Sequence, residues 1–425
     1  MFSVLQTSAQ DLNELLELHR ENLQKLYMVR GTPKEWARSG KVTESDLVQT
    51  LRTYDERVLL LIYTHANDTL YLTGIHRSGA IGTQKRAITK DSLIQLVQRF
   101  NQQMATMESP IELVSRGGHS RSGSTLAQAI TASDLTHLIL PSPSVFESFD
   151  HVIFVPMLNL GTLPFAALPL TDTTYLIDAC SYSIAPSVLE VMISKTVNDN
   201  SNERRYQHYG VFKHPLLVAN PTYPEDSIHH FANLPGTLRE VDSVQKRLQA
   251  DTVYVLTGDA ATEANVRAHF CTADLLYFAT HGVSDWKDPM NSSYLVLAPD
   301  ADSTGYFTAR EIHDSRKVCI LKAQLVVMSA CQSGLGMGHD GGVIGLSRAF
   351  QIAGANHVVM SLWNIDDQAT AELMSQFVSY LPNDLSLQPH EAMRQAMIFY
   401  RNNIDPNPKN WAAFSIFGVP YTSNF

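Results

Sequence analysis

The chain reads Leu275-Leu-Tyr-Phe-Ala-Thr-His281-Gly282 in one segment and Gln324-Leu-Val-Val-Met-Ser-Ala-Cys331 in a later one. Neither segment alternates polar and apolar residues, which indicates two strands that are buried on both faces. In an open parallel sheet, the carboxyl ends of neighbouring strands face the same crevice. We therefore expect His281 and Cys331 to lie together there, because a nearby imidazole activates a thiol by taking its proton.

The residues around these two segments predict an α/β fold. From Pro215 onward, strand-like and helix-like patterns alternate, which is typical of a parallel sheet covered by helices. Thr237-Leu-Arg-Glu240 and Thr308-Ala-Arg-Glu311 have the capping-box pattern that opens a helix, and Thr262 is a further expected N-cap. We expect strands at residues 216–219, 253–256, 275–280, 294–298, 324–331, 357–363 and 411–417, and helices at 237–248, 262–270, 343–353, 367–381 and 389–401.

The N-terminal half predicts a helix, an antiparallel meander and a second helix. Apolar residues between Ala9 and Tyr27 have the spacing of one helix face. Residues 58–86 combine short apolar runs with turn residues, and a helix from about Lys90 to Met107 follows with Thr89 as its N-cap. Because residues 196–205 are polar, we place a boundary there. The predicted parts are a helical segment 1–50, an α/β domain 51–205 and a second α/β domain 206–425.

The composition is that of a globular protein rather than a nucleic-acid or membrane protein. Of the 425 residues, 44% are hydrophobic and 17% are charged, and the net charge is −10. The basic residues form no long stripe, so nucleic acid and anionic membranes are not expected as direct partners. No apolar run approaches the roughly 20 residues that span a bilayer, and the first residues lack the pattern of a secretion signal.

The cysteine spacing suggests a reducing compartment. Cys180, Cys271, Cys319 and Cys331 are far apart and lack the CxxC pattern. This spacing argues against a structural zinc site and against a disulfide scaffold, and it favours a cytoplasmic protein with free thiols. No sequence feature indicates a metal or another cofactor, so we expect none.

Several motifs resemble those of the CHAT family, whose members are caspase-like cysteine peptidases related to separase. The match extends from about His151 to Phe417, and the interval between His281 and Cys331 is the caspase spacing. The matching motifs are Phe278-Ala-Thr-His281-Gly282, Ser329-Ala-Cys331-Gln-Ser-Gly-Leu-Gly336, Gly342-Val-Ile-Gly-Leu-Ser-Arg-Ala-Phe350, Gly354-Ala-Asn-His-Val-Val-Met-Ser-Leu-Trp363, Asp366-Asp-Gln-Ala-Thr-Ala-Glu-Leu-Met374 and Trp411-Ala-Ala-Phe414.

The resemblance implies a caspase-like layered sheet with helices on both faces, preceded by a pseudo-caspase-like α/β region. It implies that His281 is the general base and Cys331 the nucleophile of peptide-bond hydrolysis. The backbone amides of Gly282 and Cys331 are the natural donors to the oxyanion that such a reaction forms. The reaction needs no cofactor.

The resemblance also indicates a substrate pocket. Ser361-Leu-Trp-Asn-Ile-Asp-Asp367 is similar to the separase segment whose last aspartate contacts the residue before the cleaved bond. By position, Asp367 would bind a basic side chain, with Asp366 close by. The departures at Asn364 and Asp366 leave this preference open. Either aspartate also suits the N-terminus of the helix that follows.

Two functions remain open at this stage. The first is a cysteine endopeptidase that makes limited cuts in a protein substrate and is activated by a protein regulator, in bacterial signalling or defence. The second is a catalytically silent scaffold that uses the same fold for protein–protein interaction. The presence of both His281 and Cys331 favours the first.

Overall fold

The computed structural model describes most of the chain after residue 41. Described are Glu14 and residues 42–54, 56–107, 132–188, 190–192, 212–225, 230–248, 250, 252–285, 288–329, 340–381 and 388–420, with backbone alone for 132–133 and 340–344. The helix predicted between Ala9 and Tyr27 lies outside this part of the chain except for Glu14, and Cys331 lies outside it as well.

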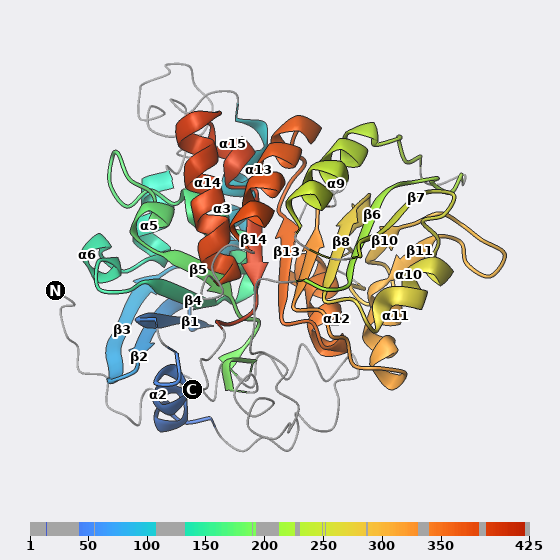
Figure 1. Cartoon of the computed structure of the whole chain (residues 1–425). Coiled ribbons are helices and arrows are strands. Elements are labelled where there is room, and N and C mark those ends of the chain that lie inside the picture. Colours follow the sequence, from blue (N-terminus) through green and yellow to red (C-terminus); the bar gives the residue numbers. More distant parts are fainter. Residues whose placement is uncertain are drawn as a thin grey trace.

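A large mixed sheet organises the described residues (Figure 1). It has eleven strands in the order β3-β2-β1-β4-β5-β14-β13-β12-β8-β6-β7. Their bounds are β1 Val58–Ala66, β2 Thr69–His76, β3 Gly79–Ala87, β4 His151–Val155, β5 Ser181–Ile184, β6 Pro215–Pro221, β7 Tyr254–Gly258, β8 Leu275–Ala279, β12 Leu325–Met328, β13 His357–Ser361 and β14 Phe414–Phe417. A separate three-stranded sheet contains β9 Gly282–Val283, β10 Tyr294–Val296 and β11 Tyr306–Thr308.

The predicted meander and the predicted parallel strands are both confirmed. Strands β1, β2 and β3 pair antiparallel, and the turn between β1 and β2 contains Asn67 and Asp68, which both have positive φ. Strands β7, β6, β8, β12 and β13 run parallel to one another. The sequences of β6, β8, β12 and β13 are short and almost wholly apolar, which suits strands that helices cover on both faces. Strand β7 lies at the sheet edge and is partly exposed.

Two details of the predicted sheet are wrong. The segment at residues 294–298 joins the small sheet through β10 instead of the large one, because it pairs with β9 and β11. The last strand begins at Phe414, since Trp411 ends a short helix, and it runs antiparallel to β13.

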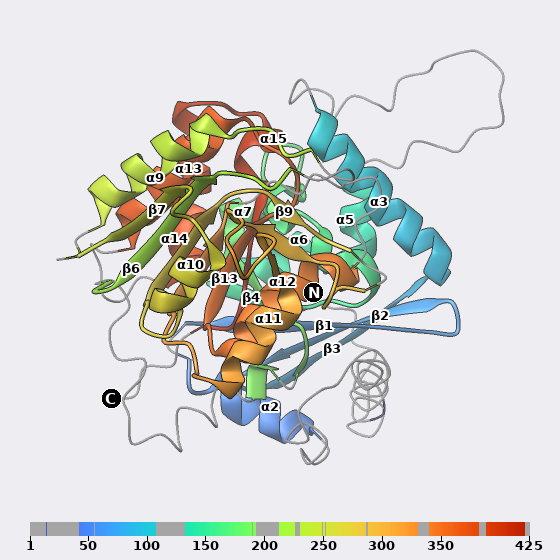
Figure 2. The same ribbon diagram turned by 90° about the vertical axis from the view of Figure 1, so that its right-hand side faces the viewer.

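Helices cover both faces of the large sheet, which confirms the predicted α/β class (Figures 1 and 2). Helices α9, α13 and α14 lie side by side on one face, and α11 and α12 pack together on the other. The bounds are α2 Glu44–Leu51, α3 Lys90–Thr106, α5 Ala132–Ile139, α6 Pro143–Phe146, α7 Leu176–Ala179, α9 Pro235–Arg247, α10 Glu263–Phe270, α11 Ala309–Asp314, α12 Asp340–Ala353, α13 Asp367–Tyr380, α14 Pro389–Asn403 and α15 Pro408–Trp411. Three short 3-10 helices are η2 Leu158–Thr162, η3 Phe165–Ala167 and η4 Ser315–Lys317.

The predicted helix caps are confirmed with one exception. Thr89 and Thr262 each accept a backbone hydrogen bond at the start of their helices, and Thr308 forms the predicted capping box with Glu311. The capping box predicted at Thr237 is wrong, because α9 already begins at Pro235 and the Thr237 hydroxyl donates to the carbonyl of Leu234. Proline is well suited to a first helical turn, because the backbone N–H that it lacks would have no partner within the helix at that position.

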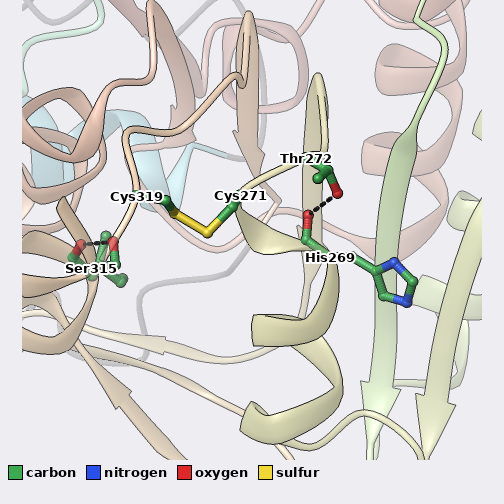
Figure 3. The surroundings of a disulfide bond; sticks show 6 residues. His269, Cys271, Thr272, Ser315 and Cys319 are labelled. Carbon is green, nitrogen blue, oxygen red and sulfur yellow. Dashed lines mark hydrogen bonds between the residues drawn. A yellow bond between two sulfur atoms is a disulfide. The ribbon is translucent and has the colours of Figure 1, made fainter. Parts of the chain in front are cut away.

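The cysteines also differ from expectation. Cys271 at the end of α10 and Cys319 after η4 form a disulfide, with their Cα atoms 6.0 Å apart (Figure 3). The sequence did not reveal this pair, because the two cysteines are 48 positions apart and their spacing does not show that the segments leading into β8 and β12 run side by side. Cys180 is free and buried. The cysteine spacing therefore no longer supports a reducing compartment.

The large sheet continues across the predicted boundary near residue 205. Strand β5 lies before that boundary and β14 lies after it, and the two pair through Ile184 and Phe417. The division into three parts remains a prediction. None of the described helices combines the length and the apolar character that crossing a bilayer requires.

Candidate active site

The sheet places the two segments that carry His281 and Cys331 next to each other. Strands β8 and β12 are parallel neighbours, and their register pairs Tyr277 with Val327 and Phe278 with Met328. Both strands therefore end at the same edge, as parallel neighbours must. His281 follows the end of β8 by two residues, whereas the description of the second segment stops at Ser329. The meeting of imidazole and thiol stays a prediction.

The hydrogen bond of His281 fixes which ring nitrogen can act as a base. Nε2 lies 2.8 Å from the carbonyl oxygen of Ala232, in the loop before α9. A carbonyl oxygen can only accept, so Nε2 carries the proton and Nδ1 of the neutral ring carries the lone pair. Nδ1 is buried and has no hydrogen-bond partner among the described residues. It is therefore the atom that is placed to take a proton from a nucleophile.

The surroundings of His281 keep its ring neutral near neutral pH. Burial lowers the pKa of His281 below its usual range, while the Ala232 carbonyl and the charge of Asp367 act in the opposite direction. Two aromatic rings of the β6–α9 loop flank the imidazole, with centroids 4.7 Å away for Tyr223 and 5.3 Å away for Phe231. A neutral imidazole with a lone pair on Nδ1 is the form that a general base requires.

The small sheet holds the backbone on both sides of His281. The Thr280 hydroxyl donates to the carbonyl of Val296, and the Val296 amide donates to the carbonyl of His281 at 2.8 Å. Gly282 begins β9 and pairs with Leu295. The predicted oxyanion donor thus lies on a strand whose backbone is fixed. Its role, like that of the Cys331 amide, remains a prediction.

The two predicted pocket aspartates have different surroundings. Asp366 is the N-cap of α13, and its Oδ1 accepts from the amides of Gln368 and Ala369 at 2.9 and 3.2 Å. The alternative interpretation as a helix cap is thus confirmed for Asp366. Asp367 instead contacts Gly236 of α9 so closely that any side chain at that glycine would overlap it. The charge of Asp367 also acts on the pKa of His281, which places this carboxylate on the side of the site.

Tryptophan anchors set the position of these aspartates. Trp363 is 1% exposed, and its Nε1 donates to the carbonyl of Lys409 at 2.9 Å. Trp411 is fully buried, and its Nε1 donates to the carbonyl of Pro406 at 3.0 Å. A buried indole N–H needs such a partner. The segment between β13 and α13 is therefore tied to the segment before β14.

Two residues near the site escaped the sequence analysis. The sequence could not predict that the Ala232 carbonyl contacts His281, because every residue type has the same backbone carbonyl. Glu240 was interpreted as part of a capping box, but its side chain is 2% exposed, and its Oε1 accepts from the Tyr277 hydroxyl at 2.5 Å. Burial is the main reason that the pKa of Glu240 rises to about 7.

One group of described residues has the composition of a metal site, but its ligand atoms already have hydrogen-bond partners. Glu56, His151 and His390 have candidate ligand atoms within 4.8 Å of one another. The two imidazole rings are tilted by 36° to each other, with centroids 3.8 Å apart. His151 already pairs with the hydroxyls of Ser181 and Ser183, and His390 pairs with Glu56. A hydrogen-bonded network describes this group better than a metal centre.

Comparisons with known proteins identify relatives of both the sequence and the fold. A model of the CHAT domain matches residues 120–419. Human tetratricopeptide repeat protein 28 is 25% identical over 302 residues, which cover 61% of this chain and 12% of the human protein. The mouse protein of the same name is 26% identical over 244 residues, which cover 48% of this chain and 9% of that protein. This chain thus spans a small part of the length of these relatives.

The similarity to a solved structure concerns the fold. The separase–securin complex of Saccharomyces cerevisiae has a TM-score of 0.56 at 10% sequence identity, covering 98% of this chain and 34% of the matched chain. The caspase-like fold that the motifs predicted is therefore confirmed, with helices on both faces of its large sheet.

Proposed function

Because this chain belongs to the CHAT domain family, we propose that it is a cysteine endopeptidase with His281 and Cys331 as its catalytic dyad. The observation that carries the proposal is the state of His281. Its Nε2 proton is held by the Ala232 carbonyl, and its Nδ1 is left with a lone pair at the end of β8, beside the strand that leads to Cys331.

The reaction follows from this arrangement. Nδ1 of His281 takes the proton of the Cys331 thiol, and the thiolate attacks the carbonyl carbon of the substrate. The amides of Gly282 and Cys331 donate to the oxyanion of the tetrahedral intermediate. Nδ1 then gives its proton to the leaving amine, and the C–N bond breaks to leave a thioester on Cys331. Water hydrolyses the thioester, with Nδ1 accepting a water proton, and the thiol is regenerated.

The substrate is a protein, and Asp367 selects a basic residue before the cleaved bond. A carboxylate on the side of His281 suits an arginine or lysine side chain because opposite charges attract strongly where water is partly excluded. The peptidase is activated by a protein regulator, in bacterial signalling or defence. These statements rest on the family and on the charge of Asp367.

The dyad is tested by the rate at which iodoacetamide alkylates Cys331, measured by mass spectrometry. In the wild type, Cys331 should react at least about tenfold faster than an ordinary thiol at neutral pH, because a nearby imidazole raises the thiolate fraction. His281→Ala should remove this excess, whereas His214→Ala, at an exposed position, should not change it.

Cys180 is an internal control in the same sample, because burial raises its pKa to about 12. Cleavage of a positional-scanning peptide library by the wild type and by Cys331→Ala then tests turnover. Cys331 reactivity that does not depend on His281, together with equal cleavage by the two proteins, would favour the silent scaffold.

A further inference from the structure

A buried carboxyl group lies under the candidate site and has no part in the reaction described above. Glu240 belongs to α9, and its side chain lies on the face of the helix that packs against the sheet, together with Gly236, Val241 and Val244. An ionisable group in such a position is costly unless it is hydrogen-bonded. The hydrogen-bond partners of Glu240 therefore indicate which segments its carboxyl group holds in place.

Glu240 has one hydrogen-bond partner on β8 and one polar neighbour just after β12. Tyr277 of β8 donates its hydroxyl to Oε1 of Glu240, and this tyrosine is fully buried. Burial raises the pKa of Tyr277 well above its usual value, so the phenol keeps its proton and remains a donor. Ser329, just after β12, lies close enough to lower the pKa of Glu240, although its hydroxyl does not reach the geometry of a full hydrogen bond.

The sheet register explains why one carboxyl group reaches both strands. Tyr277 is paired with Val327. Side chains two residues apart on a strand project from the same face, so Ser329 follows Val327 on the face that carries Tyr277. Glu240 approaches this face from α9 and lies where the two strands end. His281 follows Tyr277 by four residues, and Cys331 follows Ser329 by two.

Asp367 of α13 lies close to α9 and acts on both Glu240 and His281. It contacts Gly236, one helical turn before Glu240, and its charge raises the pKa of both Glu240 and His281. The charge of Asp367 therefore acts on both Glu240 and His281. Helix α9 can bring its backbone this close to α13 because position 236 is a glycine.

We propose that Glu240 is a positioning residue of the candidate active site. Its carboxyl group ties α9 to Tyr277 of β8, beside the end of the paired strand β12, and thereby fixes how the segments leading to His281 and Cys331 lie relative to each other. This inference rests on the proposed function for its catalytic consequence. Its structural part, the fixing of the two strand ends, can be measured without any activity.

Few charged groups surround Glu240. Among the described residues packed against α9, the titratable groups that act on Glu240 are Tyr277 of β8 and Asp367 of α13. Strand β6, which also packs against α9, contains no titratable residue. Ionisation of Glu240 strengthens the hydrogen bond that it accepts from the Tyr277 hydroxyl, because a charged acceptor forms the stronger bond. The residues that lead to His281 are then held more firmly.

The structural part is tested by hydrogen exchange followed by mass spectrometry. Glu240→Ala should speed exchange in peptides that cover the ends of β8 and β12 and leave the peptides of β1 and β2 unchanged. Glu263→Ala is the matched control, since Glu263 is also buried but bonds Arg267 and Ser303. Unchanged exchange at the strand ends in Glu240→Ala, or an equal rise in the Glu263 variant, would overturn the proposal.

The catalytic part is tested by the alkylation rate of Cys331 at two pH values. Glu240→Ala should lower this rate by about tenfold at both values, because it removes the hydrogen bond from Tyr277 whether or not the carboxyl group is charged. Glu240→Gln keeps an acceptor for Tyr277 and cannot ionise. It should match the wild type at about pH 6 and fall several-fold behind at about pH 8, where wild-type Glu240 is charged.

The outcomes separate this inference from the proposed function. For Glu240→Gln, the same ratio of variant to wild type at both pH values would mean that the charge of the carboxyl group has no effect, which would contradict the proposal. If wild-type Cys331 shows no His281-dependent reactivity, the proposed function fails, while hydrogen exchange still decides whether Glu240 fixes the strand ends. If Glu240→Ala does not fold, Tyr277→Phe removes the same hydrogen bond with less loss of packing, and it should speed exchange at the same strand ends.

Discussion

At the scale of single residues, small differences in position separate similar side chains. Asp366 and Asp367 are adjacent carboxylates at the start of α13, yet one caps the helix and the other contacts Gly236 on the side of His281. His281 itself is defined by one backbone contact, because the Ala232 carbonyl decides which ring nitrogen keeps its proton. Chemical roles at this site therefore depend on partners rather than on residue types.

The two aspartates predict different effects on substitution. Asp367→Asn should reduce cleavage after arginine or lysine by at least about tenfold relative to cleavage after leucine, because it removes the charge that would face a basic side chain. Asp366→Ala should leave this selectivity unchanged and lower the free energy of unfolding by about 1 kcal/mol through loss of the cap. Peptide-library kinetics and urea unfolding measure the two effects. An equal loss of cleavage on all substrates in Asp367→Asn would speak against its pocket role.

At the scale of elements, the site depends on how β8 and β12 are held. Helix α9 contacts β8 through the hydrogen bond between Glu240 and Tyr277, and the small sheet fixes the residues after β8. At the other end, the disulfide between Cys271 and Cys319 ties together the segments that precede these two strands (Figure 3). The strand pair is thus fastened at both ends.

The disulfide predicts a loss of stability on reduction. It spans 48 residues of sequence, and a loop of that length corresponds to a stabilisation of about 4 kcal/mol at most, mainly by restricting the unfolded chain. Dithiothreitol should therefore lower the midpoint of urea unfolding of the wild type. In the Cys271→Ser/Cys319→Ser double variant, the same reagent should have no effect, and a wild type insensitive to reduction would refute the prediction.

At the scale of the whole molecule, one sheet joins the N-terminal and C-terminal halves. The junction is the pairing of β5 with β14, and buried histidines lie close to it. His151 at the start of β4 lies against His390 of α14, while His357 at the start of β13 contacts the backbone near Gly418. Mainly through burial, the pKa of His151 lies well below its usual value and that of His357 falls to about 3.

These histidines predict that stability falls in acid. Below about pH 6.5 the unfolded chain binds protons that the folded protein cannot, so each histidine removes about 1.4 kcal/mol per pH unit until its folded pKa is reached. Urea unfolding at about pH 7 and pH 5 should show a smaller loss for His357→Gln than for the wild type. The exposed His214→Gln should keep the wild-type difference, and an equal difference in all three proteins would contradict the assignment.

Local patterns in the sequence were sufficient to predict most elements of this fold. The apolar runs of β6, β8, β12 and β13, the turn at Asn67 and Asp68, and the caps at Thr89, Thr262 and Thr308 depend on interactions within a few residues, which sequence spacing records directly. The adjacency of the segments that carry His281 and Cys331 also followed from the rule that parallel strands end at a common edge.

The sequence alone determined the class of fold, most of its strands and helices, and the residues that could take part in a reaction. Interactions between residues that are close in sequence decide these features, and they leave a periodic pattern. The tertiary structure alone decided the disulfide, the backbone partner of His281, the burial of Glu240 against Tyr277 and the antiparallel direction of β14. Each of these joins residues that lie tens of positions apart. Spacing along the chain carries no record of such contacts, since they depend on how whole elements pack.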